Sequence, residues 1–578
     1  MDTAEGQLPR AREGWSLTRT LAWVAERPLA VLIAFVAVVF NLWETRGQTF
    51  FSDEWSRYLY ADKSVSGLLR GHSGHLVLLN TVLYKAILYT FGAGSYLPFR
   101  IAEALLLAIC GVLFYALARN WAGPWECLAA TVVLLFLGSS LEVTVTPTGT
   151  VNLMPIAFGL AALICLQRFK GEGMGDAITC LLLVAAVASH SDGLAFLAAA
   201  AVMLALQDRR RVWSRSWVVA IPAVLYVAWL IWYRAEATST TQEVVHLHNL
   251  GGIPSTIVAA AATGLSALSG LFGSAESAHG VPFNIEAGYL LLGLLIVAAA
   301  WRLRSGRPIA REIWVVLALG LSFWFLLGLV VTAHRPATAS RYIYPSAVFL
   351  LLIILVLVGR VRGTPWVIWG TAAAVLVSVV PNLIAYNDGS NRLREWAVVE
   401  RADLGAVQLL KEEVPLDSIP ELSRGARLVT VGGRGFKFPA ITYFNAVVRY
   451  GSPAASPQGI ASMPEDRRKA VDGVLLSGDD LTLTNAPAGL AAAGRRCRPA
   501  LGTSVSAAEV FRVPASGLVI RPRGSRSTLG VEARRFADSF HRLHVPAGSG
   551  PVLLEPGASQ AVRPWLAKIS DGTVCSLR

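Results

Sequence analysis

The chain has 578 residues and a formal net charge of +13, and 54% of its residues are hydrophobic while only 15% are charged. Together with a mean hydropathy of +0.52, this composition excludes an ordinary soluble globular domain and is typical of a polytopic membrane protein. The sequence lacks the glycine-rich, CxxC and HExxH motifs of nucleotide, dinucleotide and zinc sites. It therefore gives no support to nucleotide hydrolysis, dinucleotide redox chemistry or zinc catalysis.

Residues 1–27 are polar and carry Arg10, Arg12, Arg19 and Arg27. The apolar run that follows them has no small-residue cleavage site after it. We therefore predict a cytoplasmic N-terminal segment that leads into a retained helix, and not a signal peptide.

A helix that spans a membrane needs about 20 mostly apolar residues. Many stretches meet or approach this length, and we predict spans at 28–46, 97–118, 125–142, 151–167, 176–190, 192–207, 215–233, 284–301, 311–333, 343–360 and 366–386. Two further apolar stretches are ambiguous, because 75–92 contains Asn80 and Lys85 and because 255–273 is rich in small residues.

Basic residues of membrane proteins gather in short cytoplasmic loops. The densest basic runs of this chain lie at 168–170, 208–215, 302–307 and 360–362. All of them fall on the cytoplasmic side if both ambiguous stretches lie in the interface, whereas a spanning 75–92 would force 208–215 outside. We therefore predict a transmembrane catalytic domain over residues 28–386, with about 11 spans and two juxtamembrane helices.

This topology places all nine histidines on the outer side of the membrane. They are His72, His75, His190, His246, His248, His279, His334, His541 and His544. An active site that opens to the exterior gathers titratable groups in this way, but outer loops that are simply longer do so too. Both interpretations remain open at the level of the sequence.

Residues 387–578 are predicted to form an extracytoplasmic α+β domain. A helical pattern at 391–414 is followed, after Pro415, by short alternating stretches such as ARLVTV, AEVFRV, GLVIRP, RLHVP and PVLLEP, which indicate strands. Cys497 and Cys575 are its only cysteines. We expect them to be linked, because disulfides form outside the cytoplasm, and two free thiols are the alternative. The remaining cysteines fall in predicted spans and are interpreted as packing residues.

The stretch FFSDEWSRYLY, residues 50–60, places Asp53 and Glu54 where the chain leaves the first predicted span. Carboxylates at that depth are costly unless they have a partner or a function. An Asp in this position also commonly caps the helix after it. The aromatic residues of the stretch and the GHSGH segment with His72 and His75 nevertheless favour chemistry. We therefore predict Asp53 as the catalytic base, with Glu54 beside it in the catalytic site.

An enzyme with a lipid-linked phosphate donor also needs cations to neutralise the leaving phosphate. The outer loop HRPATASRYIY offers Arg335, Arg341, Tyr342 and Tyr344, and arginine is well shaped to hold phosphate oxygens. Lys85 on the first juxtamembrane helix is a further candidate charge. Ordinary interfacial snorkelling is the alternative for the loop, and it is weaker for Arg341, which precedes a span on the outer side.

The SHSDG sequence at 189–193 divides a long apolar run into two short spans and places His190 and Asp192 at an outer turn. Asp and Gly favour turns without any function. A structural and a substrate-binding interpretation of this turn are therefore equally open. In the second interpretation His190 and Asp192 join His72 and His75 in the substrate-binding set.

This arrangement resembles the GT-C class of membrane glycosyltransferases, especially its protein O-mannosyltransferase and lipid A aminoarabinose transferase branch. The similarity lies in the run from SDEWSRYLYADKSVSGLL to HSGHLVLLNTVLYKAILYTFGAGSYLPFRIAEALL, near the start of the chain. It implies that Asp53 is the catalytic carboxylate and that residues 72–75 belong to the donor or acceptor site. This chain has HSGH where that branch usually has a Lys-Pro-Pro motif.

The leading hypothesis is a glycosyltransferase that moves a sugar from a polyprenyl-phosphate donor to a glycan, lipid or protein acceptor at the outer face of the plasma membrane. The alternatives are a transporter or flippase of lipid-linked glycans and a non-enzymatic envelope protein that binds a glycan. Transporters often show internal repeats and polar residues at the midplane, and this sequence shows neither. A divalent metal remains open as a cofactor, and no nucleic-acid partner is expected.

Reporter fusions test the predicted topology. Reporters after residues 170, 210, 305 and 362 are expected to report a cytoplasmic location, because these positions lie in or beside the basic loops. Reporters after residues 60, 192, 240, 338 and 400 are expected to report an exterior location. An exterior signal at 210 would contradict both the span count and the shared side of the histidines.

Overall fold

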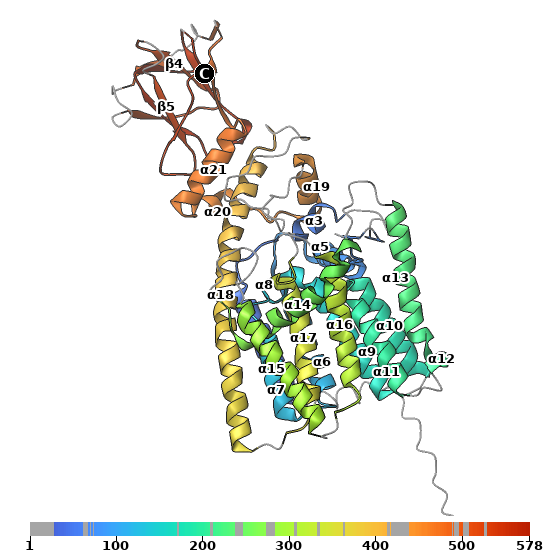
Figure 1. Cartoon of the computed structure of the whole chain (residues 1–578). Helices are drawn as coiled ribbons and strands as arrows, with labels where there is room; N and C mark the ends of the chain where they lie inside the picture. Colours follow the sequence, from blue (N-terminus) through green and yellow to red (C-terminus); the bar gives the residue numbers. More distant parts are fainter. Residues whose placement is uncertain are drawn as a thin grey trace, which may run out of the picture.

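The structure is a computed structural model, and it shows a bundle of helices with a smaller β-rich domain at one end (Figure 1). The helix α18 (Pro365–Leu409) runs between the two parts. The described residues are 28–51, 53–61, 68–69, 71–72, 74–169, 173–207, 212–236, 247–272, 284–305, 309–331, 336–361, 364–412, 417, 439–487, 489–490, 496–500, 508–524, 529–548 and 550–577.

Among these residues, eight helices are long and apolar enough to cross a membrane. They are α6 (Leu97–Ala118), α9 (Thr150–Arg168, preceded by the 3-10 turn Pro147–Gly149), α13 (Trp217–Glu236), α14 (Ile253–Ser269), α15 (Ile285–Arg304), α16 (Ile313–Val330), α17 (Ser340–Val358) and α18. Shorter apolar helices are α2 (Pro28–Glu44), α5 (Leu78–Phe91), α7 (Pro124–Leu135), α10 (Gly173–Ser189) and α11 (Gly193–Gln207).

Each predicted span and each predicted juxtamembrane segment overlaps one of these helices, so the polytopic helical class is confirmed. The helix α14, for which the sequence favours a juxtamembrane position, is among the long helices, and its position therefore stays a prediction. The short helices α8 (Leu141–Thr144) and α12 (Val212–Arg215) and the 3-10 turn Leu247–Gly252 connect the longer ones.

Proline and glycine set several of the helix ends. Proline stands in the first turn of α6, α7, α14 and α18, where an N–H group has no partner within the helix. Gly270 follows α14 with a φ of +74°, and a Cβ atom there would lie 2.7 Å from the carbonyl oxygen of Val377. Only glycine therefore permits this close approach of α14 to α18.

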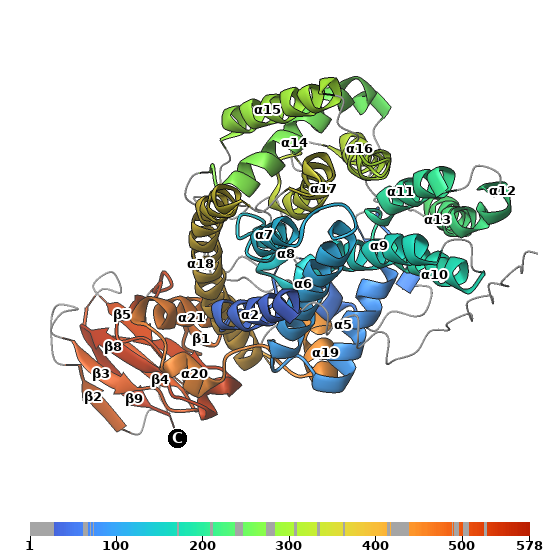
Figure 2. The ribbon, with the colours of Figure 1, turned by 90° about the horizontal axis from the view of Figure 1, so that it is seen from below.

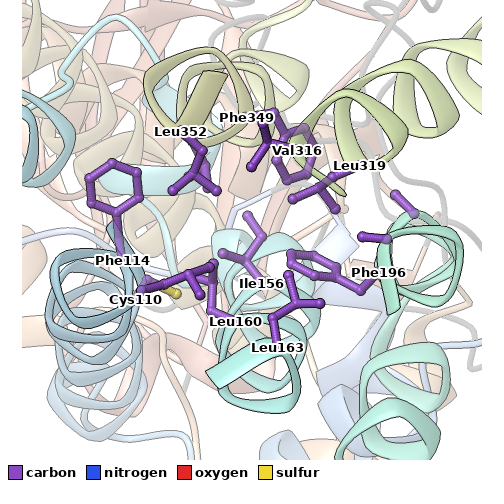
Figure 3. Close-up of a cluster of buried hydrophobic side chains, with 14 of the residues drawn as sticks. Cys110, Phe114, Ile156, Leu160, Leu163, Phe196, Val316, Leu319, Phe349 and Leu352 are labelled. Carbon is purple, nitrogen blue, oxygen red and sulfur yellow. The ribbon is translucent and has the colours of Figure 1, made fainter. Parts of the chain in front are cut away.

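Close packing of apolar side chains holds the bundle together. Side chains from α6, α9, α11, α16 and α17 meet in one buried cluster, among them Cys110 and Ile156 (Figure 3). The ring of Phe349 makes edge contacts with Phe196 and Phe323, with centroids 5.9 and 5.3 Å apart. Such offset aromatic contacts add to the stabilisation from burial alone.

The helix α18 continues without a break from the bundle to the β-rich domain. Its 45 residues correspond to a length of about 68 Å, more than the hydrocarbon thickness of about 30 Å. Within the bundle, the side chain of Asn382 accepts a hydrogen bond from the backbone N–H of Ser139 at 2.9 Å, and Asn41 donates to the hydroxyl of Tyr386 at 2.7 Å. The domain boundary that the sequence predicts at residue 386 thus falls inside this helix.

Beyond the bundle, α18 packs with the helix α3 (Asp53–Leu59) and with α19 (Ala440–Tyr450), α20 (Pro457–Ala461) and α21 (Glu465–Ser477). Trp55 of α3 belongs to the same buried cluster as Leu404 of α18 and Tyr443 of α19. The hydroxyl of Tyr58 donates to the carbonyl of Gly451 at 2.8 Å. These contacts fix α3 between the bundle and the β-rich domain.

The β-rich domain contains two antiparallel sheets among its described residues. A five-stranded sheet has the order β1-β7-β4-β9-β2, and a four-stranded sheet has the order β3-β8-β5-β6. The strands are β1 (Leu481–Asn485), β2 (Arg496–Pro499), β3 (Glu509–Arg512), β4 (Leu518–Pro522), β5 (Gly530–Arg534), β6 (His541–Arg542), β7 (Val552–Pro556), β8 (Leu566–Ser570) and β9 (Gly572–Ser576), with the 3-10 turn Ala558–Ala561 after β7. Seen from below, this domain lies to one side of the bundle, next to α18 (Figure 2).

The two sheets face each other across a common core, to which Ile520 and Leu554 contribute from one sheet and Ala533 and Ile569 from the other. This confirms the α+β class, but the domain has two sheets where the sequence predicts one small sheet. The stretches AEVFRV, GLVIRP and PVLLEP contain β3, β4 and β7, and RLHVP overlaps only the end of β6. The predicted strand ARLVTV lies outside the described residues.

Cys497 of β2 and Cys575 of β9 are directly opposite each other and form a disulfide, with Cα atoms 4.0 Å apart. This confirms the predicted link. Cys110, Cys127 and Cys180 are free and buried, in agreement with their interpretation as packing residues, and Cys165 is partly buried.

The side chains of Arg535 and Asp480 form a fully buried ion pair in the β-rich domain, with Nη1 2.5 Å from Oδ2 and both side chains 0% exposed. We expect Arg535→Ala to lower the unfolding free energy of this domain by about 3–5 kcal/mol, because Asp480 would stay buried without its cation. Hydrogen exchange of β7 and β8 in the full-length protein measures the change. Arg496→Ala, at an exposed position of β2, is the matched control. Equal protection of β7 and β8 from hydrogen exchange in Arg535→Ala and Arg496→Ala would contradict the stabilising role of the buried ion pair.

Candidate active site

The helix α3 begins at Asp53 and is held by aromatic side chains on both sides of that residue. Phe50 stacks on Tyr58 with ring centroids 5.4 Å apart, and Phe51 stacks on Trp396 of α18 at 5.8 Å. Tyr58 is fully buried. The first residue of the helix, Asp53, is therefore held firmly at the end of the bundle.

Glu54 is fully buried beneath α3. Its carboxylate accepts hydrogen bonds from the backbone N–H of Phe51 at 2.9 Å and from the hydroxyls of Tyr84 at 2.8 Å, Thr148 at 3.1 Å and Tyr96. Burial raises the pKa of Glu54, although these hydrogen bonds favour the charged form. A carboxylate with no access to solvent and with both oxygens occupied is suited to position α3 and not to meet a substrate.

Asp53 faces a different environment. Its Oδ2 atom lies 3.1 Å from Nε2 of His72, and the two side chains are 33% and 35% exposed. Burial alone would raise the pKa of Asp53, but the hydrogen bond with His72, together with the nearby charges of Arg57 and Arg341, holds that pKa well below its usual value. Asp53 is therefore ionised at neutral pH and accessible.

The GHSGH segment forms a turn whose two histidines contact different partners. His72 and His75 exchange backbone N–H to O bonds of 2.9 and 3.0 Å, and Gly74 between them has a φ of 82°, which favours glycine. His72 contacts Asp53, whereas Nδ1 of His75 contacts the hydroxyl of Ser191. The turn therefore joins α3 to the connection between α10 and α11.

The SHSDG turn contributes a second group of titratable side chains. Nδ1 of His190 lies 3.0 Å from Oδ1 of Asp192, and the amide of Asn152 donates to the other carboxylate oxygen at 2.9 Å. The rings of His75 and His190 are 4.4 Å apart. The structure thus brings the histidines of the two turns together. Across the part of the chain that the structure describes, no three His, Cys, Asp or Glu side chains are placed to hold a metal ion.

A cavity of about 150 Å³ lies beside His72. Residues of α3 and α5, together with Leu68, Gly71 and His72, line it, and Arg57 and Lys85 are the Arg and Lys residues among its described lining. Arg57 is 9% exposed, and its guanidinium lies 4.7 Å from the ring centroid of Tyr84. A cavity with such a lining is suited to an anionic group.

Arg341 at the start of α17 pairs with Glu142 of α8, with Nε 3.1 Å from Oε2. Its charge is also among those that lower the pKa of Asp53. Tyr342 lies beside Arg341, whose guanidinium is 5.8 Å from the ring centroid. Arg335 lies outside the described residues.

Tyr344 does not join this site. Its side chain is fully buried inside the bundle, where it is near Cys110 and Glu103. The apolar residues around it on α17 are buried too, and Tyr344 is not among the residues that line the cavity. The structure therefore separates Tyr344 from Arg341 although the two lie only one helical turn apart.

Three residues of the site were not identified from the sequence, namely Arg57, Glu142 and Ser191. Arg57 follows Asp53 by one helical turn, and this spacing places two side chains on one helix face. The sequence pattern alone could therefore have placed Arg57 beside Asp53. No sequence pattern points to Glu142 or Ser191, because only the folded chain brings α8 to α17 and the SHSDG turn to His75.

No family model matches the chain, and no curated protein matches it. Among solved structures, it is similar to the crystal structure of ArnT from Cupriavidus metallidurans bound to undecaprenyl phosphate, with 12% identity and a TM-score of 0.41 over 70% of this chain and 82% of that chain. It is also similar to the archaeal oligosaccharyltransferase AglB from Archaeoglobus fulgidus in complex with an inhibitory peptide and a dolichol-phosphate, with 10% identity and a TM-score of 0.37 over 95% of this chain and 78% of that chain. At these values neither likeness carries an argument about function, which has to come from the site.

Replacing Glu54 with Gln is expected to loosen α3 and to lower the unfolding free energy by about 1–3 kcal/mol, because the amide presents hydrogens to N–H and O–H donors. Burial raises the pKa of Glu54 in the folded protein above its ordinary value of 4.5. Ionisation of Glu54 therefore destabilises the fold as the pH rises from that value through the folded-state pKa.

The melting temperature of the wild type should consequently fall more steeply with rising pH than that of Glu54→Gln. Thermal unfolding between roughly pH 4 and 8 measures both slopes. The control is Glu555→Gln, at an exposed position of β7, and it should keep the wild-type slope. If the melting temperatures of Glu54→Gln and the wild type fell equally steeply with rising pH, ionisation of Glu54 would not be what destabilises the fold.

Proposed function

We propose that this chain is a membrane glycosyltransferase that moves a sugar from a polyprenyl-phosphate donor to an acceptor hydroxyl at the exterior face of the plasma membrane. The observation that carries this proposal is the contact between Asp53 and His72 beside a cavity that Arg57 and Lys85 line. An ionised proton acceptor and positive charges for a phosphate thus lie in one region.

Asp53 supplies the proton acceptor, and His72 holds it in place with Nε2 3.1 Å from Oδ2. In the proposed step, the acceptor oxygen bonds to the anomeric carbon while the bond from that carbon to the phosphate oxygen breaks, and the hydroxyl proton passes to Asp53. A carboxylate with a low pKa is a weak base. It can still accept this proton late in the step, because the hydroxyl becomes strongly acidic once its oxygen bonds to the anomeric carbon.

Arg57, Lys85 and Arg341 supply the charge for the leaving phosphate. Two of them line the cavity, and the charge of Arg341 reaches Asp53. Negative charge grows on the bridging oxygen as its bond to the sugar breaks, and cations already in place stabilise that charge without rearrangement. The planar guanidinium groups are suited to grip two phosphate oxygens at once.

The site and the β-rich domain share one side of the membrane in this proposal. The buried cluster of α3, α18 and α19 ties the two together, and both lie at the same end of the bundle (Figure 1). The disulfide between Cys497 and Cys575 favours the exterior for that side. A donor that arrives within the membrane also removes any need for a soluble nucleotide-sugar site.

Two variants separate proton transfer from phosphate binding. Asp53→Asn keeps the size and polarity of the side chain, so we expect it to bind polyprenyl phosphate normally while turnover falls by at least about 100-fold. Arg341→Ala removes a charged donor and is expected to weaken binding by about tenfold. Arg341→Lys keeps the charge beside Glu142. Its affinity for polyprenyl phosphate should therefore lie between that of Arg341→Ala and that of the wild type.

Native mass spectrometry of the purified protein measures bound polyprenyl phosphate, and release of that lipid from its sugar-linked form measures turnover. Asp466→Asn, at an exposed position of α21, is the matched control for Asp53→Asn. Wild-type turnover in Asp53→Asn would overturn the role of Asp53. A protein that neither copurifies with polyprenyl phosphate nor binds it would overturn the donor class.

A further inference from the structure

The outer face of the four-stranded sheet gathers basic side chains. Side chains along a strand alternate between its two faces, and Ala533 and Ala567 face the core of the domain. Their neighbours in the strand register therefore form two outward rows, Val510–Lys568–Glu532–Arg542 and Arg512–Leu566–Arg534. We call the surface made by Arg512, Arg534, Arg542, Lys568 and Phe540 the basic face.

Phe540 supplies an aromatic surface among these cations. The guanidinium of Arg534 lies 4.7 Å from the centroid of its ring, and the ammonium of Lys568 lies 5.9 Å from it. Such contacts orient cations over an aromatic ring. Val510, which is 47% exposed, extends the apolar part of the same surface.

The positive charge of the basic face exceeds the negative charge around it. Glu532 is the one carboxylate in the two outward rows. Asp538 at the rim pairs with Arg468 at 2.5 Å and lies 3.9 Å from Nη1 of Arg534, so these two carboxylates face the four cations of the basic face. Arg512 and Arg542 are exposed and form no ion pair with any residue that the structure describes. A surface with this excess attracts anionic ligands.

We propose that the basic face binds an acidic polysaccharide. Guanidinium groups match the carboxylate or phosphate groups of such a polymer, and Phe540 and Val510 offer apolar surface to its sugar rings. The edge strands β3 and β6 are about 14 Å apart at the usual strand spacing. A chain that crosses the sheet therefore meets Arg512 at one edge and Arg542 at the other.

The position of the domain favours a polymer over a lipid surface. The sheets lie outside the outline of the helical bundle in both Figure 1 and Figure 2, at the end of α18 that leaves the bundle. A soluble or wall-bound polymer reaches such a surface without contact with lipid headgroups. The proposed binding of a polysaccharide does not depend on the proposed transfer reaction. It can be measured with the purified protein, whatever the orientation of the chain in the membrane.

Binding of the full-length protein in detergent to polygalacturonate tests the proposal, with neutral dextran as the reference polymer. The double variant Arg512→Ala/Arg542→Ala is expected to bind polygalacturonate at least about tenfold more weakly at low salt, where charges are little screened. The matched control is Arg496→Ala/Arg498→Ala, which removes the same charge from β2 of the other sheet. It should change the affinity less than about twofold.

Phe540→Leu keeps every charge and is expected to weaken binding by about threefold, which provides a second measurement if the double variant unfolds. Vesicles that contain phosphatidylglycerol are the alternative anionic probe. The proposal would be overturned if the two double variants lost affinity for polygalacturonate equally, or if the wild type did not bind polygalacturonate. A loss confined to the vesicles would overturn it in favour of a lipid surface.

Discussion

Four hydrogen-bond donors converge on the buried carboxylate of Glu54, and the arrangement of the site follows from that convergence. A carboxylate without water is tolerated only where its lone pairs are satisfied. The donors come from Phe51 just before α3, from Tyr84 on α5, from Tyr96 before α6 and from Thr148 before α9. Each of these segments is therefore held in a fixed position relative to α3, and Asp53 is held with it.

Asp53 and Glu54 are neighbours in sequence whose surroundings shift their pKa values in opposite directions. Burial dominates for Glu54, while for Asp53 the hydrogen bond with His72 and the nearby charges together outweigh burial. The two adjacent carboxyl groups thereby differ, because Glu54 is buried in the protein whereas Asp53 is partly exposed beside His72. A pair of titratable groups separated in this way is typical of sites that combine a rigid support with an ionised group at neutral pH.

The sequence was informative wherever one local pattern decided the structure. Long apolar runs predicted the helices of the bundle, and the position of Asp53 after the first run predicted a carboxylate at its end. The sequence did not reveal the continuity of α18, because the residues from Asn387 to Ser390 have the composition of a loop. Packing overrides that preference: Gly389 is buried, and a Cβ atom there would lie 2.4 Å from Leu141. The pairing of Arg341 with Glu142 likewise arises only when α8 meets α17.

An unbroken helix that is anchored at both ends transmits force from one end to the other. A pull on the sheet domain is carried along α18 to Asn382 and Tyr386, which are hydrogen-bonded inside the bundle. On the way it passes Trp396, whose ring lies against Phe51, two residues before Asp53. Tension on the β-rich domain therefore has a mechanical path of a few side chains to Asp53.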